Sequence, residues 1–270
     1  MQPQPLDDLV EAVLSRPDYR HISVDLVRWI GRQEIGKRRN LKEAVKFTRS
    51  RLHQIAAAYQ EPRVEYGRWL EELSSLPHEL DDPRLKDFCR RVMAHHASTR
   101  ERLPILKPFF GQTLSRIAPL HSILDIGCGM NPLALPWMPL AEDITYHGLD
   151  IYSDQAAFLN AFLSHTGVSG SVQVHNVLNG LPDNLPHFQV ALLLKTLPCL
   201  EQLDKTISRR LLKTIRAGHL VISYPVHSLG GRSKGMLQNY QNHFEILAGQ
   251  SGWTAERLEF QTELVFIVEL

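Results

Sequence analysis

Ile123-Leu124-Asp125-Ile126-Gly127-Cys128-Gly129-Met130-Asn131-Pro132 is the stretch that decides the fold of this chain. An apolar run with an acid near its end leads into two glycines. Gly127 and Gly129 allow a tight turn and a close approach of the backbone to a ligand, because they carry no Cβ. Asn131 is a good helix N-cap and Pro132 suits the first helical position, so we expect a helix to begin there. A strand, a glycine turn and a helix N-terminus together form the nucleotide site of doubly wound α/β proteins.

A second acid lies at the spacing expected for a ribose contact. Residues 144–149 read as a strand, and Asp150 follows it, twenty-one positions after Gly129. An acid about 20 residues beyond the glycine turn can hydrogen-bond a ribose diol. The third glycine of the dinucleotide fingerprint is absent, which argues against NAD. Asp125 at the strand end is typical of sites for S-adenosylmethionine (SAM), whose ammonium group is cationic. The whole pattern therefore favours SAM. The alternative is a tight turn that binds no ligand.

The composition places the chain among soluble proteins with a substantial core. It has 270 residues, of which 43% are apolar, enough for one large domain or two small ones. The N-terminal residues do not read as a signal peptide, and no apolar run approaches the ~18 residues of a membrane span. Three scattered cysteines make no disulfide framework. We therefore expect a cytoplasmic protein that does not contact a membrane.

The formal net charge of +1 hides an asymmetry between the two halves of the chain. Residues 1–120 contain 21 Lys and Arg against 16 Asp and Glu, whereas residues 121–270 contain 9 against 13. A basic half joined to an acidic half with a cofactor site predicts a division of labour. The first would hold an anionic macromolecule and the second would modify it.

The first half reads as helical, with almost no strand signals. Breaks are expected near Pro17, Pro62, Pro77 and Pro83. The expected helices cover residues 5–15, 22–36, 40–60, 64–75, 80–94 and 98–118.

The helix expected over residues 40–60 carries an apolar stripe beside a basic one. The apolar stripe consists, at helical spacing, of Leu41, Val45, Leu52, Ile55 and Tyr59. The basic residues are Arg38, Arg39, Lys42, Lys46, Arg49 and His53. One interpretation is an ordinary solvated face. Like charges four residues apart repel unless an anion offsets them, so we favour a surface that binds the phosphates of RNA.

The second half alternates between strands and helices, which predicts a mostly parallel sheet covered on both faces. Strands are expected at 121–126, 144–149, 171–176, 188–194, 218–224, 253–258 and 263–269. Helices are expected at 132–138, 153–165, 199–214 and 236–249. Because no helix separates the last two strands, they should pair antiparallel. The predicted fold is an α/β, seven-stranded, Rossmann-like SAM-dependent methyltransferase domain at residues 118–270, preceded by an all-helical RNA-binding domain at residues 1–117.

Several blocks of residues resemble a known family, the 16S ribosomal RNA methyltransferases of the guanine-N7 (Arm/Rmt/Sgm) type, which confer aminoglycoside resistance. The blocks are His95-His96-Ala97-Ser98-Thr99-Arg100-Glu101-Arg102, Ser228-Leu229-Gly230-Gly231-Arg232-Ser233-Lys234-Gly235-Met236, and residues 52–59, 125–133 and 194–198. The matches run from about residue 40 to Leu270. The resemblance implies a helical RNA-binding domain on a SAM-binding domain that acts on assembled 30S subunits.

The resemblance also implies which residues contact SAM. Arg102 would hold the carboxylate of the cofactor, Gly127 would lie under it and Asp150 would bind its ribose. The full set of expected cofactor contacts is Tyr59, His96, Ala97, Ser98, Arg102, Gly127, Asp150, Asn176, Val177, Leu194 and Gln202.

Asn176 departs from the family pattern. It matches the first residue of the adenine-contacting pair, where relatives carry Asp, and Val177 matches the second. An asparagine keeps one acceptor oxygen for the adenine amino group but lacks the charge. We therefore expect weaker SAM binding at this position.

The expected chemistry needs no general base. Guanine N7 is an unprotonated acceptor, so positioning and desolvation can carry the methyl transfer. Residues 195–198 read Lys-Thr-Leu-Pro, unlike the motif that methylates exocyclic amines. Lys195 would be either a structural ion pair or a positioning contact near SAM or RNA.

Pro198-Cys199 raises a different mechanism, because a Pro-Cys at this place marks cytosine-C5 methyltransferases. There the cysteine attacks the base and an acid protonates the ring, and Glu201 is available as that acid. The resemblance points away from this mechanism, and we expect Cys199 to play no nucleophilic part. Cys128 in the glycine turn is expected to be a small filler.

The glycine-rich residues 228–236 follow the expected fifth strand. A flexible solvated loop is one interpretation; by resemblance, Arg232, Lys234 and Met236 would contact the target nucleotide and its phosphates. The thirteen histidines show no metal-ligand spacing, so no metal is expected.

Together with these residues, the resemblance implies an enzyme that transfers a methyl group from SAM to N7 of guanine 1405 in the 16S rRNA of the 30S subunit, releasing S-adenosylhomocysteine and giving aminoglycoside resistance. We expect it to act as a monomer. The alternatives are methylation of adenine N1 or of cytosine C5 through Cys199, or a non-catalytic RNA-binding protein that keeps a SAM fold as scaffold. A small-molecule methyltransferase would have no need of the basic half.

Overall fold

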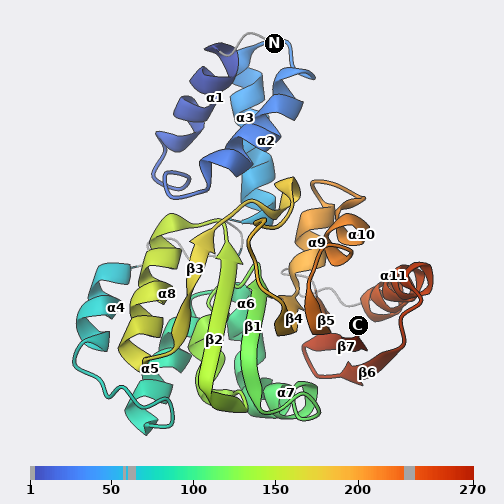
Figure 1. Cartoon of the computed structure of the whole chain (residues 1–270). Coiled ribbons are helices and arrows are strands. Elements are labelled where there is room, and N and C mark those ends of the chain that lie inside the picture. The colour runs from blue at the N-terminus through green and yellow to red at the C-terminus, as the bar shows by residue number, and fades with distance from the viewer. Residues whose placement is uncertain (1–3, 57–58, 60–64, 228–234) are drawn as a thin grey trace.

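The computed structural model describes residues 4–56, 59, 65–227 and 235–270. Its centre is a seven-stranded sheet in the order β3-β2-β1-β4-β5-β7-β6 (Figure 1). β7 pairs antiparallel with β5 and β6, and all other neighbours are parallel. The strands are β1 (Leu120–Ile126), β2 (Leu140–Asp150), β3 (Ser169–Val174), β4 (Phe188–Leu194), β5 (Ala217–Pro225), β6 (Ala255–Glu259) and β7 (Glu263–Glu269). The expected fold and the antiparallel final pair are confirmed.

The register of the central strands places the turns that follow β1, β2 and β4 at one edge of the sheet. Asp125 of β1 lies opposite Gly148 of β2 and Leu192 of β4. The carboxyl ends of these parallel strands therefore meet at the same edge, which we call the carboxyl edge. Ligands of open α/β sheets bind at this edge.

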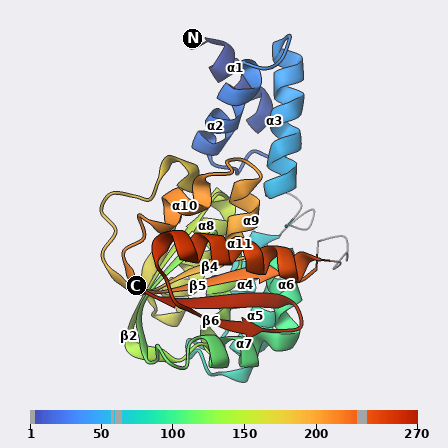
Figure 2. The same ribbon diagram turned by 90° about the vertical axis from the view of Figure 1, so that its right-hand side faces the viewer.

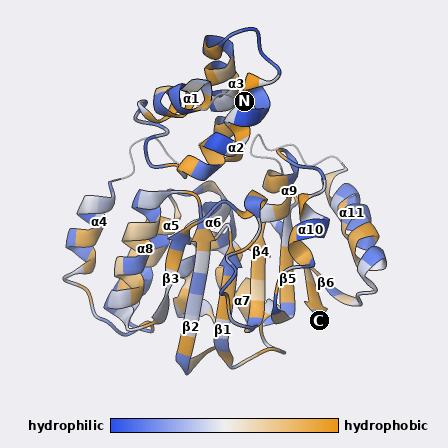
Figure 3. Ribbon diagram, turned by 45° about the horizontal axis from the view of Figure 1, so that its top comes forward, coloured by the Kyte–Doolittle hydropathy of each residue, from blue (hydrophilic) through white to orange (hydrophobic). Residues whose placement is uncertain are grey.

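Alternate residues of the central strands face two apolar cores, as the period of a strand requires. Ile123 packs in the core that also contains Phe88, Phe109 and Phe158, whereas Leu124 packs in the core that contains Phe244. The long apolar runs of β4 and β5 are buried on both faces, and the strands stand out as apolar in Figure 3. This is the pattern of a mostly parallel sheet with helices on both sides.

The helical segments after β1 differ in detail from the sequence expectation. They are η3 (Asn131–Trp137), α8 (Ser153–Thr166), η4 (Val177–Asn179), α9 (Thr196–Glu201), α10 (Ile207–Leu212) and α11 (Met236–Ser251). η3 is a 3₁₀ helix with Pro136 inside it, where an α-helix would lose a hydrogen bond. The single helix expected at 199–214 is two, because Asp204 accepts hydrogen bonds from the backbone N–H and hydroxyl of Thr206 and forms a turn.

Most helices of the first half are shorter than expected, and the last is divided. They are α1 (Gln4–Leu14), α2 (Val24–Ile35), α3 (Leu41–Ile55), α4 (Tyr66–Leu73), α5 (Pro83–Met93), α6 (Ala97–Arg102), η2 (Leu103–Ile105) and α7 (Leu106–Thr113). The expected helix at 98–118 is interrupted by η2, which contains Pro104. The expected helix at 40–60 ends at Ile55, so Tyr59 lies beyond its end.

The helices of the first half form two groups. α1, α2 and α3, which we call the helical unit, pack on one another and stand above the carboxyl edge (Figures 1 and 2). In contrast, α4, α5 and α7 share a core with the sheet and α8. The division of the chain at residues 117 and 118 stays a prediction about domain organisation.

The helical unit meets the sheet directly after β2. Ile22 forms an isolated antiparallel bridge with Tyr152. The N–H of Ser23 donates to the carbonyl of Ile151 at 2.7 Å, and the N–H of Ser153 donates to the carbonyl of His21 at 2.8 Å. These bonds lie one to three residues from Asp150. In the parts of the chain that the structure describes, none of the helices combines the length and apolarity needed to cross a membrane.

Candidate functional site

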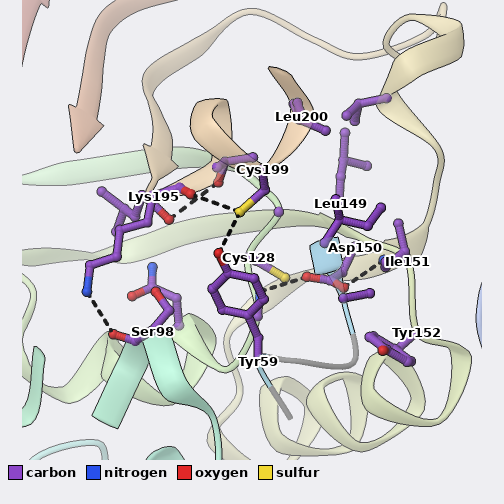
Figure 4. A pocket seen from close by; sticks show the side chains of 18 of the residues that line it. Tyr59, Ser98, Cys128, Leu149, Asp150, Ile151, Tyr152, Lys195, Cys199 and Leu200 are labelled. Carbon is purple, nitrogen blue, oxygen red and sulfur yellow. Dashed lines mark hydrogen bonds between the residues drawn. The ribbon is translucent and has the colours of Figure 1, made fainter. Parts of the chain in front are cut away.

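A pocket opens at the carboxyl edge, between the sheet and the helical unit (Figure 4). The sheet contributes the turns after β1, β2, β3 and β4, and the helical unit contributes Leu26, Ile55 and Ala56. Of the expected cofactor contacts, those that line the pocket are Tyr59, His96, Ser98, Arg102, Gly127, Asp150, Asn176, Val177 and Leu194. Ala97 is buried outside the lining, and Gln202 is exposed beside the lining residue Leu203.

The glycine turn is shaped to bring its backbone to the pocket. Gly127 and Gly129 have φ of 68° and 50°, in the left-handed region that glycine tolerates. A Cβ on Gly127 would lie 2.8 Å from Thr196 Cγ2, and one on Gly129 would lie 2.8 Å from His96 Cε1. No other residue fits either position without displacing these neighbours.

Backbone donors hold the side chain of Asp150 at the end of β2. Its Oδ2 accepts from the N–H of Gly129 and its Oδ1 accepts from the N–H of Ile151, each at 2.7 Å. Burial raises the pKa of Asp150, and these bonds oppose the rise. The N–H of Tyr152 and the side chain of Gln155 also interact with this carboxylate. Because the carboxylate lines the pocket, hydroxyl groups of a ligand can approach its oxygens.

Arg102 forms a fully buried bidentate ion pair that no sequence pattern indicated. Its Nε and Nη2 donate to Glu263 at 2.7 and 3.0 Å, and its Nη1 donates to Asn131 Oδ1 at 3.1 Å. Burial alone would raise the pKa of Glu263, but Arg102 and Lys195 hold it below its usual value. A guanidinium has five N–H groups, so two remain for an anionic group in the pocket that Arg102 lines.

Lys195 makes the structural ion pair that the sequence left open. Its Nζ lies 2.7 Å from Glu101 and 3.5 Å from Glu263, and the residue also lines the pocket. Its φ of 61° is the one left-handed value of a residue other than glycine in the described chain. Such strain gathers at functional sites because the surroundings must enforce it.

Asp125 lies behind the pocket wall. Its Oδ2 accepts from Asn131 Nδ2 at 2.6 Å and from the Tyr146 hydroxyl at 2.5 Å. Burial raises its pKa to about 6. Asn131 lines the pocket and Asp125 does not, so Asp125 acts on the pocket through the side chain it orients.

Two buried polar atoms of the lining have no partner in the described parts of the chain. They are Nδ1 of His96 and Nδ2 of Asn176. Burial lowers the pKa of His96 to about 4, so the ring is neutral near pH 7. Buried polar groups in native proteins are nearly always hydrogen-bonded. A ligand with polar atoms is therefore the expected occupant, and these residues fit an adenosyl cofactor.

Comparisons with known proteins agree with this geometry. The chain matches the family described as Ribosomal RNA methyltransferase (FmrO) over residues 15–267. The chain belongs to this family. A 16S rRNA (guanine(1405)-N(7))-methyltransferase of Micromonospora echinospora is 34% identical over 98% of this chain and 96% of the relative. One of the same name from Serratia marcescens is 30% identical over 98% of both chains.

Two solved structures share the whole architecture of this chain. The 16S rRNA methyltransferase RmtF, solved in complex with S-adenosyl-L-homocysteine, has a TM-score of 0.81 at 27% identity, covering 100% of this chain and 99% of its own. The 16S rRNA methylase RmtB has a TM-score of 0.79 at 25% identity, covering 98% of both chains.

In this FmrO-family methyltransferase, Cys199 is unsuited to nucleophilic attack. Its thiol lies 3.0 Å from the hydroxyl of Tyr59, and burial raises its pKa, so the reactive thiolate is disfavoured. Glu201 is the acid that a C5 mechanism would need. It accepts a hydrogen bond from the hydroxyl of Ser208, and His243 Nε2 lies 3.0 Å from its Oε1. Cys128 is buried with a raised pKa, as expected of a small filler.

Some of the basic residues expected to bind RNA are exposed, whereas others make contacts within the protein. Arg39, Lys42 and Lys46 are exposed. In contrast, Arg38 pairs with Glu34 at 2.8 Å and stacks on a phenylalanine ring, and Arg49 donates to the carbonyl of Ala12. Arg38 and Arg49 thus also hold the helical unit together, which the charge pattern did not reveal.

The expected contacts to the target nucleotide are only partly visible in this methyltransferase. Arg232 and Lys234 lie outside the described residues. Met236 is the first residue of α11 and is partly exposed. In the described ranges, no group of His, Cys, Asp and Glu side chains could hold a metal ion.

Sequence reasoning missed two features of the site. Glu263 is an isolated acid in front of the apolar run at 264–268, and that isolation is the signal that could have marked it. Leu26 and Ile55 line the pocket from the helical unit. The apolar stripe on α3 indicated that Ile55 is packed, but not against which partner.

Proposed function

We propose that this protein transfers the methyl group of SAM to N7 of guanine 1405 in the 16S rRNA of the 30S subunit. The observation that carries the proposal is the pocket at the carboxyl edge, with Asp150, Arg102 and two unpartnered polar atoms, in a chain 34% identical over nearly its full length to a methyltransferase of that name. The product would be S-adenosylhomocysteine, and the modification would give cells resistance to kanamycin- and gentamicin-type drugs.

Three parts of the cofactor have matching groups in the pocket. Asp150 would accept hydrogen bonds from the ribose hydroxyls, and the two spare N–H groups of Arg102 would donate to the carboxylate. Asn176 and Val177, after β3, would border the adenine. When bound, SAM supplies an electrophilic methyl group. The residues of this chain then orient both reactants and exclude water.

Methylation of guanine N7 requires no general base. The ring nitrogen carries a lone pair and no proton, so nothing has to be deprotonated before attack. Lys195 is engaged with carboxylates, and Cys199 is a protonated thiol beside Tyr59. Catalysis by positioning alone suits this arrangement, and neither side chain offers the nucleophile that a cytosine-C5 mechanism needs.

The exposed basic residues of the helical unit would hold the ribosome. Arg39, Lys42 and Lys46 project from α3 and the turn before it, and phosphate contacts by such residues supply sequence-independent affinity. Because the unit stands above the carboxyl edge (Figure 1) and lines the pocket with Leu26 and Ile55, RNA bound to it would lie near that edge. A 30S particle in the cytoplasm is the expected substrate.

The test is mass spectrometry of 16S rRNA after purified enzyme and SAM are incubated with 30S subunits, 50S subunits or free 16S rRNA. The expected product is 7-methylguanine at position 1405, formed on 30S subunits. Methylation of adenine N1 or cytosine C5 would refute the assignment. Tight SAM binding without turnover on any of these particles would instead support a non-catalytic RNA-binding role.

A further inference from the structure

Asn176 occupies a position where its side chain can be oriented without ambiguity. It follows β3 and caps η4, is 4% exposed and lines the pocket. Its Oδ1 accepts a hydrogen bond from the N–H of Leu178 at 3.2 Å. The opposite amide orientation would set the NH₂ group against that N–H, donor against donor. The backbone of η4 therefore fixes Oδ1 on Leu178 and leaves Nδ2 as the remaining corner of the amide.

Nδ2 is a hydrogen-bond donor for which the described residues provide no acceptor. It is buried and has no partner in the described parts of the chain. Leaving such a donor unpaired costs about 1–3 kcal/mol, so an acceptor on the pocket occupant is the expected partner. The polar side chain next to it, His175, is already engaged, with Nε2 2.8 Å from the carbonyl of Gly180.

This arrangement offers an alternative to the expectation that the oxygen of Asn176 accepts from the adenine amino group. The oxygen points to the N–H of Leu178 and keeps one further lone pair, whereas the group without a partner, Nδ2, has the opposite hydrogen-bond polarity. An aspartate here could accept from Leu178 with one oxygen and from an amino group with the other. The asparagine can only donate with its second group. Adenine offers it acceptors at its ring nitrogens, whereas the C6 amino group is a donor.

We propose that Asn176 donates a hydrogen bond from Nδ2 to a ring nitrogen of the cofactor purine and makes no hydrogen bond to the C6 amino group. The proposal rests on the proposed function in one respect, that the purine is the adenine of SAM. The consequence is relaxed selection at C6: a cofactor analogue without the amino group should bind nearly as well as the natural one. Asn176 thereby becomes a residue that sets cofactor specificity.

The experiment is calorimetric binding of two ligands to three proteins. The ligands are S-adenosylhomocysteine and its analogue with an unsubstituted purine, which keeps the ring nitrogens and lacks the C6 amino group. The proteins are the wild type, Asn176→Asp and Asn176→Ala. Thermal unfolding of each free protein identifies any variant that fails to fold.

The three proteins should give three different patterns. The wild type should bind both ligands within about threefold of each other. Asn176→Asp should prefer S-adenosylhomocysteine by tenfold or more. Its carboxylate can accept a hydrogen bond from the C6 amino group of S-adenosylhomocysteine, whereas the analogue presents only acceptor nitrogens to it. Asn176→Ala should bind both ligands more weakly, by similar factors.

A wild type that prefers S-adenosylhomocysteine tenfold or more, or an Asn176→Ala variant that binds as the wild type does, would overturn the proposal. In either case the cofactor assignment itself would stand. Failure of the wild type to bind either ligand would overturn both this proposal and the SAM-dependent function.

Discussion

Arg102 of α6 and Glu263 of β7 form a bidentate ion pair across 161 positions of sequence, with both side chains almost completely buried. The pair joins the segment before the glycine turn to the antiparallel end of the sheet. Asn131 and Lys195 complete the network around it. Because Glu263 takes two donors of Arg102, it fixes the plane of the guanidinium and the direction of the remaining N–H groups.

Glu263→Gln should weaken both the fold and one part of cofactor recognition. Removing one charge of a buried pair leaves the other charge buried without a partner of opposite sign, so the free energy of unfolding should fall by about 3 kcal/mol. Affinity for S-adenosylhomocysteine should fall, whereas affinity for methylthioadenosine, which lacks the carboxylate, should not change. Denaturant unfolding and calorimetry measure the two effects. Glu256→Gln on β6, whose partner Arg116 is exposed, is the matched control and should change stability by less than about 1 kcal/mol. Equal losses for both ligands would remove Arg102 from the carboxylate site.

The parts of the site that the sequence predicted are those encoded locally. Gly127, Gly129 and Asp150 are linked by a fixed spacing, because a strand, a turn, a helix and a second strand have standard lengths. The structure brings all three to the pocket lining and joins two of them through the bond from Gly129 N–H to Asp150. Strand positions were equally readable, since continuous apolar runs are required wherever both faces of a sheet are covered.

What the sequence did not predict depends on long-range partners or on a single turn. The Arg102–Glu263 pair has no local signature, because the two residues lie on elements that meet only in the folded chain. The break between α9 and α10 depends on one side chain, Asp204, which bonds Thr206 in place of the helix. The polarity of Asn176 depends on the backbone N–H of Leu178, which no spacing rule reveals.

Asp150→Ala should lower the affinity for S-adenosylhomocysteine by about 2 kcal/mol, the value of the lost charge-assisted hydrogen bonds. The free N–H groups of Gly129 and Ile151 would add to this loss by loosening the turn. Calorimetry measures the affinity. Asp154→Ala, at the start of α8, is the control, since Asp154 is outside the pocket lining. An unchanged affinity in Asp150→Ala would exclude that residue from the cofactor site.

Cys199→Ala should methylate 30S subunits at a rate within a few-fold of the wild type. The buried thiol has a raised pKa and is therefore not a nucleophile. The measurement is the amount of 7-methylguanine formed in a single turnover. A variant that still binds S-adenosylhomocysteine but loses all turnover, together with a covalent wild-type adduct on RNA, would restore the C5 mechanism.

His96 should make the protein less stable as the pH falls. Burial, with Arg102, Lys195 and Arg100 nearby, lowers its folded-state pKa to about 4. Between pH 6.5 and 4 the unfolded chain therefore binds a proton that the folded chain does not, and the free energy of unfolding falls as the pH falls. At pH 4.5 the loss relative to pH 7 is about 2 kcal/mol. Asp125, whose pKa is raised to about 6, acts in the opposite direction over the same range.

Comparison with His96→Gln isolates the histidine contribution. Denaturant unfolding at pH 7 and pH 4.5 should show a change with pH that is more favourable in the variant by about 2 kcal/mol, whatever the variant costs at pH 7. Identical pH dependence in the two proteins would show that His96 is protonated alike in the folded and unfolded states.

Lys42→Glu combined with Lys46→Glu should abolish binding to 30S subunits and leave affinity for S-adenosylhomocysteine within threefold. Both lysines are exposed on α3, and reversing two phosphate contacts replaces attraction with repulsion. Cosedimentation with 30S subunits at several salt concentrations measures the first effect and calorimetry the second. The matched control reverses Lys86 on α5 and Lys107 on α7, at the far end of the sheet in Figure 1. If both double variants lose 30S binding equally, net charge and not the helical unit holds the ribosome.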